Sequence, residues 1–252
     1  MDDLARAKAL LDGAARIVVL TGAGISTDSG IQDFRGPNGL WTKNPEAEKQ
    51  ATLSHYVGNP DVRRASWQAR INNPIFHAEP NAGHAAIAEL ERTGKVMAVL
   101  TQNVDGLHLL AGTSAELLVE VHGNVREVVC LQCDERAPMQ RALDRVRAGE
   151  DDPACRTCGG ILKSATISFG QALVAADLER ADDAARSCDV LLAVGSTLGV
   201  YPIAGVVPIA KREGAAIIIV NGGPTEMDDL ADVVLRGSIS ELLPALVGMS
   251  TH

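Results

Sequence analysis

Aromatic residues are scarce in this chain of 252 residues, which has two Trp, two Tyr and three Phe. Basic residues are also in deficit, because 23 Lys and Arg stand against 32 Asp and Glu and give a formal net charge of −9. Binding to nucleic acid relies on cations that meet phosphates and on rings that stack on bases. We therefore expect no direct nucleic-acid partner.

Long apolar runs and a leader-like start are missing as well. No apolar run approaches the ~20 residues that span a bilayer. The first residues, MDDLARAKAL, are acidic and amphipathic, whereas a secretion signal is basic and then apolar. We expect a cytoplasmic protein without a membrane partner, with a monomer plausible. Its 46% hydrophobic and 22% charged residues favour an ordered globular chain.

Short apolar runs recur along the chain, as in parallel strands that are buried on both faces. They lie at residues 17–20, 96–100, 190–194 and 216–220. Helices are predicted over residues 3–12 and over residues 201–213, where Pro208 would kink the second helix or delay its start. This alternation predicts an α/β fold with a Rossmann-like doubly wound parallel sheet.

Two stretches interrupt the alternation. Residues 34–95 hold several prolines but no strong strand run, and residues 127–165 carry four of the five cysteines. We expect them to form the helical part and the zinc-ribbon part of a smaller module. Residues 1–33, 96–126 and 166–252 would then form the Rossmann-like domain, and the cleft between the two would be the natural ligand site.

A glycine-rich turn follows the first apolar run. Gly22-Ala23-Gly24 could bring backbone amides close to a phosphate, but Thr27 stands where a dehydrogenase has its third glycine. Taken alone, the turn fits a phosphate loop or a plain structural turn. Phe34 and Arg35, next to Asp33, could cover a reactive sugar and clamp a pyrophosphate, or could equally be a core ring and a solvated cation.

Polar residues stand where two further strands end. Gln102, Asn103 and Asp105 follow the run at 96–100, at the edge of the sheet where ligands bind in open α/β folds. They can hydrogen-bond a ribose and a carboxamide, or form an ordinary Asn/Asp turn. His122 ends an alternating segment before Gly123, and a histidine there suits either general-base chemistry or a structural role.

Two Cys-x-x-Cys pairs point to a metal site. The first pair is Cys130 and Cys133, and the second is Cys155 and Cys158. The pairs are separated by 21 residues, and Gly159-Gly160 follows the second pair. Such pairs predict one tetrahedral zinc. With four thiolates the ion has no open position, so the zinc is expected to be structural. Cys188 is expected to be a small buried residue.

These motifs stand in a fixed order along nearly the whole chain, and this order resembles the sirtuins, the NAD-dependent protein lysine deacylases. The matching segments are Gly22-Ala23-Gly24-Ile25-Ser26, Asp33-Phe34-Arg35-Gly36, Thr101-Gln102-Asn103-Val104-Asp105, His122-Gly123, both cysteine pairs, Phe169-Gly170, Gly195-Ser196 and Val220-Asn221. The combination is specific, although each motif alone is not. The family's fold, a Rossmann-like domain with a smaller zinc-and-helix module, agrees with the organisation predicted above.

The resemblance implies a reaction that consumes NAD, releases nicotinamide and leaves O-acyl-ADP-ribose and a deacylated lysine. It implies His122 as general base, with Asn103 and Asp105 as further catalytic residues. The substrate peptide is expected as an added strand near Phe169-Gly170 and Gly199-Val200. The implied NAD contacts, besides the three catalytic residues, are Gly22, Ala23, Gly24, Thr27, Asp33, Phe34, Arg35, Gln102, Val104, Gly195, Ser196, Thr197 and Asn221.

The sequence departs from the family in ways that bear on NAD affinity and on the acyl group. Gln32 replaces a usual proline, which could loosen the cofactor loop. Sirtuins that remove acidic acyl groups carry Tyr-x-x-Arg, and the nearest match here is Trp67-x-x-Arg70. Arg70 could pair with an acyl carboxylate or lie on a solvated helix face. We expect a deacylase with acetyl favoured and succinyl second.

Two other functions stay open from the sequence. One is a mono-ADP-ribosyltransferase on the same scaffold, although a base such as His122 is less needed there. The other is a non-enzymatic zinc-ribbon interaction module, which leaves four residues unexplained: Gln102, Asn103, Asp105 and His122.

Overall fold

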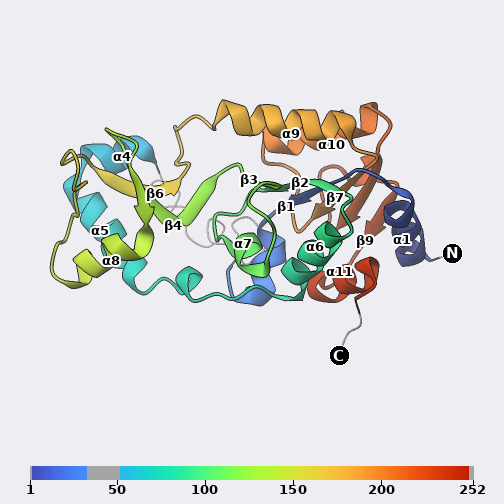
Figure 1. The fold of residues 1–252 in the computed structure, drawn as a ribbon, viewed down its shortest axis with the longest axis horizontal. Coiled ribbons are helices and arrows are strands. Elements are labelled where there is room, and N and C mark those ends of the chain that lie inside the picture. Colours follow the sequence, from blue (N-terminus) through green and yellow to red (C-terminus); the bar gives the residue numbers. More distant parts are fainter. Residues whose placement is uncertain (1, 33–51, 250–252) are drawn as a thin grey trace.

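The structure is a computed structural model that describes residues 2–32 and 52–249, and Figure 1 shows a larger and a smaller part side by side along its long axis. The larger part is built on a six-stranded parallel sheet with the order β3-β2-β1-β7-β8-β9. The order reverses between β1 and β7, as in doubly wound folds, so the predicted fold class is confirmed. The strands are β1 (Ile17–Thr21), β2 (Val96–Thr101), β3 (Leu118–Glu120), β7 (Val190–Val194), β8 (Ala216–Val220) and β9 (Val233–Leu235).

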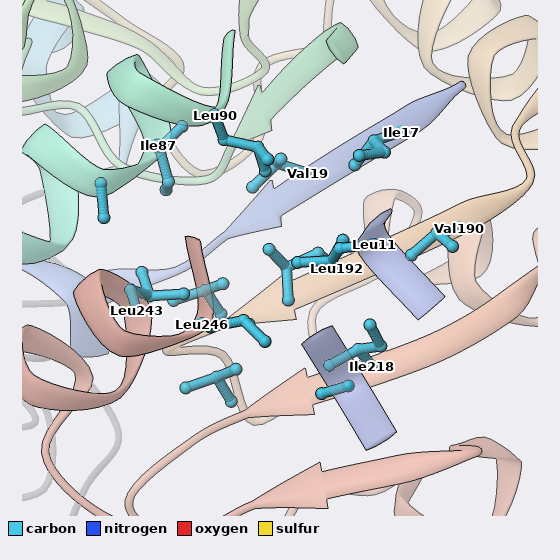
Figure 2. Packing of buried hydrophobic residues seen from close by; sticks show 14 of the residues in the cluster. Leu11, Ile17, Val19, Ile87, Leu90, Val190, Leu192, Ile218, Leu243 and Leu246 are labelled. Carbon is cyan, nitrogen blue, oxygen red and sulfur yellow. The ribbon is translucent and has the colours of Figure 1, made fainter. Parts of the chain in front are cut away.

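Helices cover both faces of this sheet. They are α1 (Asp3–Gly13), α6 (Ala82–Arg92), α7 (Leu107–Ala111), α9 (Ala175–Ser187), α10 (Val206–Arg212) and α11 (Ile239–Val247). Alternate residues of β1 point to opposite faces. Ile17 and Val19 therefore pack with α1, α6 and α11, a layer shown in Figure 2, while Val18 and Leu20 pack with α9 and α10. Burial on both sides explains why the central strands are continuously apolar.

Both predicted helices form, and local residues explain where each of them begins. The side chain of Asp2 caps α1 by accepting a hydrogen bond from the amide of Ala5. The crossover helix begins later than residue 201, because a short 3₁₀ turn (Ile203–Gly205) precedes α10. Pro208 is the third residue of α10, in the first turn, where a missing N–H removes no helical hydrogen bond. The proline thus delays the helix without kinking it.

The smaller part joins an antiparallel sheet to three helices. The sheet has the order β5-β4-β6. Its strands are β4 (Gly123–Cys130), β5 (Arg136–Pro138) and β6 (Leu162–Thr166), and its helices are α4 (Leu53–Gly58), α5 (Pro60–Ile71) and α8 (Met139–Arg147). Trp67 of α5, Met139 and Leu143 of α8 and Val128 of β4 form one buried core. The helical and cysteine-bearing stretches therefore pack together as expected.

One predicted boundary differs from the structure. Residues 34–95 were assigned as a whole to the small module, yet α6 packs on the large sheet through Ile87 and Leu90 (Figure 2). An amphipathic helix shows in its sequence that it covers a core but not which core it covers. Among the described residues, no helix is long and apolar enough to cross a membrane.

Candidate active site

A cleft of about 1970 Å³ lies between the two parts of the molecule. One wall comes from the loops that follow β1, β2, β7 and β8, and the other comes from α5 and β6. Pockets for a single small ligand usually measure ~300–1,000 Å³. The cleft therefore has room for a dinucleotide and for part of a second substrate.

Two glycine loops meet backbone to backbone at the point where the strand order reverses. The amide of Gly24 donates to the carbonyl of Gly195 over 2.8 Å. A Cβ on Gly24 would lie 2.8 Å from the Cα of Gly195, and a Cβ on Gly195 would lie 2.4 Å from the amide nitrogen of Ile25. Gly195 also has a φ of +64°, which favours glycine. Ala23, Gly24 and Gly195 line the cleft, whereas the cleft lining does not include Gly22.

The hydroxyl of Ser26 links the polar residues that follow β2 by hydrogen bonds. Ser26 Oγ accepts from the side-chain amide of Asn103 (3.1 Å) and donates to Asp105 Oδ2 (2.7 Å). The other oxygen of Asp105 accepts the amide of Leu107. Asn103 and Val104 line the cleft, while Asp105 is 3% exposed and does not belong to its lining. Asp105 thus holds its neighbours in place from behind the cleft wall.

Two buried histidines, which the sequence reasoning passed over, extend this network. The amide of Asn81 donates to Nδ1 of His84, so Nε2 of His84 carries the hydrogen that points at Ser26 Oγ, 3.4 Å away. Burial lowers the pKa of His84 to about 4 and that of His108 to about 3, so both rings are neutral near pH 7. His108 Nε2 lies 2.9 Å from Thr21 Oγ1. The Asn81-x-x-His84 spacing at a helix start was the available signal, since it forms a capping box.

Among the histidines that the structure describes, His122 is the one that lines the cleft. Its Nδ1 lies 2.9 Å from the carbonyl oxygen of Gln102. A carbonyl oxygen can only accept, so Nδ1 carries the hydrogen and Nε2 of the neutral ring keeps its lone pair. The Gln102 carbonyl therefore sets the tautomer in which His122 can take up a proton through Nε2.

One of the remaining expected NAD contacts, Gln102, carries an unsatisfied donor. Nε2 of Gln102 is buried and has no hydrogen-bond partner among the described residues, while its Oε1 lies 3.4 Å from the hydroxyl of Ser196. A buried polar group is normally paired, so this donor fits a ligand oxygen such as a ribose hydroxyl. Thr27, Thr197 and Asn221 also line the cleft. Asp33, Phe34 and Arg35 lie outside the described residues.

The expected substrate residues divide between the cleft and the core. Phe169, Gly170, Gly199 and Val200 line the cleft, as does Arg70. Trp67 is fully buried in the core of the smaller part, so it does not form a wall of the cleft. Its ring lies behind Arg70 instead, with the guanidinium carbon 5.3 Å from the ring centroid.

The four paired cysteines converge at the far end of the smaller part. Their sulfurs lie within 4.8 Å of one another, with Cys130–Cys158 at 3.5 Å and Cys133–Cys155 at 3.7 Å. Sulfurs that bind one tetrahedral zinc at ~2.3 Å are ~3.8 Å apart, so the set fits this ion. Gly160 is required beside it, because a Cβ there would lie 2.8 Å from the sulfur of Cys130.

Comparisons with known proteins agree with this site. Residues 22–202 match the model of the Sir2 family. The chain is 51% identical to NAD-dependent protein deacetylase 2 of Streptomyces coelicolor over 237 residues. This alignment covers 94% of this chain and 98% of that protein. Two solved structures cover 98–99% of this chain and 99–100% of their own. One is a Sir2 histidine variant with a deacetylated p53 peptide and 3′-O-acetyl-ADP-ribose (TM-score 0.88, 32% identity), and the other is Sir2 bound to an acetylated peptide (TM-score 0.86, 30% identity).

The fold and the cleft define an NAD-dependent protein deacylase with NAD as co-substrate and a cysteine cluster that suits one structural zinc. The chain belongs to the Sir2 family, the sirtuins, as its motifs predicted.

Removal of one zinc ligand should cost both the metal and stability. We expect Cys155→Ser to lose the bound zinc and to lower the melting temperature by roughly 10 °C, because the cluster ties the ends of the smaller part together. Metal analysis and calorimetry measure both effects. The control is Cys188→Ser, a buried cysteine outside the cluster, which should retain one zinc per chain. Full zinc content in Cys155→Ser would contradict the assignment.

Glu120, two residues before His122, should make stability depend on pH. Burial raises its pKa from 4.5 to about 7, although the side-chain amide of Asn124 hydrogen-bonds it. The folded protein then holds this proton more tightly than the unfolded chain, so stability falls as pH rises from 4.5 to 7 and the loss is complete above 7. We expect Glu120→Gln to be more stable than the parent at pH 8 by about 1–3 kcal/mol, and equal to it near pH 4. Denaturant unfolding across this range measures the difference, and parallel pH profiles would contradict it.

Proposed function

We propose that His122 is the general base of the deacylation. The observation that carries this proposal is the Nδ1–H hydrogen bond to the Gln102 carbonyl, which leaves Nε2 as an acceptor on a cleft residue. NAD supplies the ADP-ribosyl group that takes the acyl group. The balanced reaction converts acyl-lysine, NAD and water into lysine, O-acyl-ADP-ribose and nicotinamide. His122 accepts a proton from a ribose hydroxyl, which makes that oxygen nucleophilic toward the acyl carbon.

The residues around His122 hold the reacting groups in place. Gln102 and Ser196 offer hydrogen bonds to a ribose, and Asn103 presents its amide from a frame that Ser26 and Asp105 fix. The glycine loops let backbone amides approach the phosphates. Asp33, Phe34, Arg35, Thr197 and Asn221 complete the proposed NAD site.

We propose that the acyl-lysine peptide adds a strand in the cleft. The backbone N–H groups of Gly199 and Val200 form no hydrogen bond with another described residue, and both residues line the cleft. Such an open edge is suited to main-chain pairing with an extended peptide. Phe169 and Gly170 would provide the opposite edge. Similar Sir2 structures contain a bound peptide, which supports a peptide site in this chain.

The acyl group is proposed from the cations in the cleft. Arg70 donates to Ser164 Oγ at 3.4 Å, and no described carboxylate pairs with it. Lys163 donates to the carbonyl of Ser164, and burial together with the charge of Arg70 lowers its pKa to about 8. The names of the relatives favour acetyl as the main acyl group. Arg70 would let the same cleft accept an acidic acyl group such as succinyl.

The state of the thiols bears on the cell compartment. All five cysteines are unbridged, and four lie in a metal-type cluster, which suits a reducing compartment. We therefore propose that the enzyme acts in the cytoplasm.

Loss of His122 should abolish deacylation. We expect His122→Ala to lower kcat/KM for acetyl-lysine and succinyl-lysine peptides by roughly 10²–10⁴-fold, because no other described cleft residue replaces the base. Mass spectrometry of peptides incubated with NAD measures lysine and O-acyl-ADP-ribose together. The control is His55→Ala, an exposed histidine outside the cleft. If the parent leaves acyl peptides intact and adds the mass of ADP-ribose to protein, the enzyme is a transferase instead.

Arg70 should separate acidic from neutral acyl groups. We expect Arg70→Leu to lower desuccinylation by roughly tenfold or more while deacetylation falls less, because only the succinyl carboxylate needs the cation. The readout is the ratio of kcat/KM for matched succinyl and acetyl peptides. An unchanged ratio would rule out Arg70 as the carboxylate partner.

A further inference from the structure

A carboxylate lies over the backbone segment that we propose to pair with the peptide. A Cβ built on Gly199 would lie 2.2 Å from Oε1 and 2.7 Å from Cδ of Glu226. The Glu226 side chain therefore occupies the space that a side chain at position 199 would fill. Gly199 itself lines the cleft. The carboxylate of Glu226 thus lies beside Gly199, which has no side chain of its own.

The turn that carries Glu226 is held on both sides. The amide of Glu226 donates to the carbonyl of Thr197 over 2.9 Å. Thr225 donates to Asp228 through its hydroxyl (2.6 Å) and its amide (3.2 Å), and Asp228 pairs with Arg236. The backbone at Glu226 is therefore fixed relative to the β7 loop.

Glu226 has no cation of its own. No described Lys, Arg or His forms an ion pair with it, and the basic residue near this turn, Arg236, is already paired with Asp228. The side chain is exposed, so a partner from solution can reach it. Since Arg236 is paired within the turn, Glu226 presents a carboxylate next to Gly199 that no described cation neutralises.

Strand geometry fixes which peptide residue would meet this charge. Residues opposite each other in paired strands point their side chains to the same face, with Cβ atoms ~4.5–5.5 Å apart, and opposite charges there attract while like charges repel. The peptide residue opposite Gly199 would meet the Glu226 carboxylate in place of a side chain at 199. Because Gly199 has no Cβ, it places no side chain of its own between the two.

We propose that Glu226 selects substrates by charge, favouring acyl-lysine peptides with Lys or Arg opposite Gly199 and disfavouring Asp or Glu there. This inference rests on the proposed pairing of the peptide with Gly199 and Val200. It assigns to Glu226 a role in choosing the protein site to be deacylated, separate from the role of Arg70 toward the acyl group.

The test compares acetyl-lysine peptides that differ at one position. Lys, Gln or Glu is placed in turn at each of about three positions on either side of the acetyl-lysine, and kcat/KM is measured at low and high salt. We expect the parent to prefer Lys over Glu at one position by roughly fivefold to tenfold, and less at high salt because exposed charges are screened. Glu226→Gln should bring this ratio close to one, and Glu226→Lys should reverse it.

The matched control is Glu179→Gln, an exposed glutamate on α9 that is not among the groups nearest to Gly199, and it should keep the parental ratio. A parent with no charge preference at any position would overturn the proposal, as would a Glu226→Lys variant that keeps the parental preference. These results differ from a failure of the proposed function, in which the parent deacylates none of the peptides.

Discussion

The contact between two glycine loops is the constraint on which the site depends. Gly24 and Gly195 approach so closely that neither can carry a side chain without displacing the other loop. This contact joins the ends of β1 and β7 at the reversal of strand order. The carbonyl of Gly22 then accepts the side-chain amide of Asn103, which brings the end of β2 to the same place. The groups that we propose to bind the cofactor and to act on it are thus brought together from three strands by contacts at their ends.

A buried polar network centred on Ser26 lies next to that contact. An unpaired buried hydroxyl or carboxylate costs free energy, and here Ser26 satisfies Asn103 and Asp105 at once. The neutral His84 supplies a further donor to the same hydroxyl. Because the Asn103 side-chain amide donates both to Ser26 Oγ and to the carbonyl of Gly22, it has one preferred orientation. The hydrogen bonds of the network therefore fix the orientation of a side chain that lines the cleft.

Sequence reasoning succeeded where a local pattern carries the physics. Continuous apolar runs predicted the central strands, since only strands covered on both faces need them, and cysteine spacing predicted the metal cluster. It fell short where the answer depends on which surfaces meet. The aromatic ring of Trp67 stood beside Arg70 in the sequence, but the structure buries it behind that residue. His84 and His108 gained their setting from burial between elements far apart in the chain, and the short β9 carries too few residues to be distinguished.

The two parts of the molecule are coupled through β4. This strand begins directly after His122 and ends at Cys130, so one element connects the proposed base to the metal cluster. Arg126, between them, donates to the carbonyl of Asp105 over 2.8 Å and reaches the carbonyl of Ile75 in the second wall of the cleft. A structural ion that fixes one end of β4 therefore also limits how far the loop of Asp105 and the ring of His122 can move. Zinc need not take part in the chemistry for catalysis to depend on it, because the strand that it would anchor positions the residues that we propose to act on the substrate.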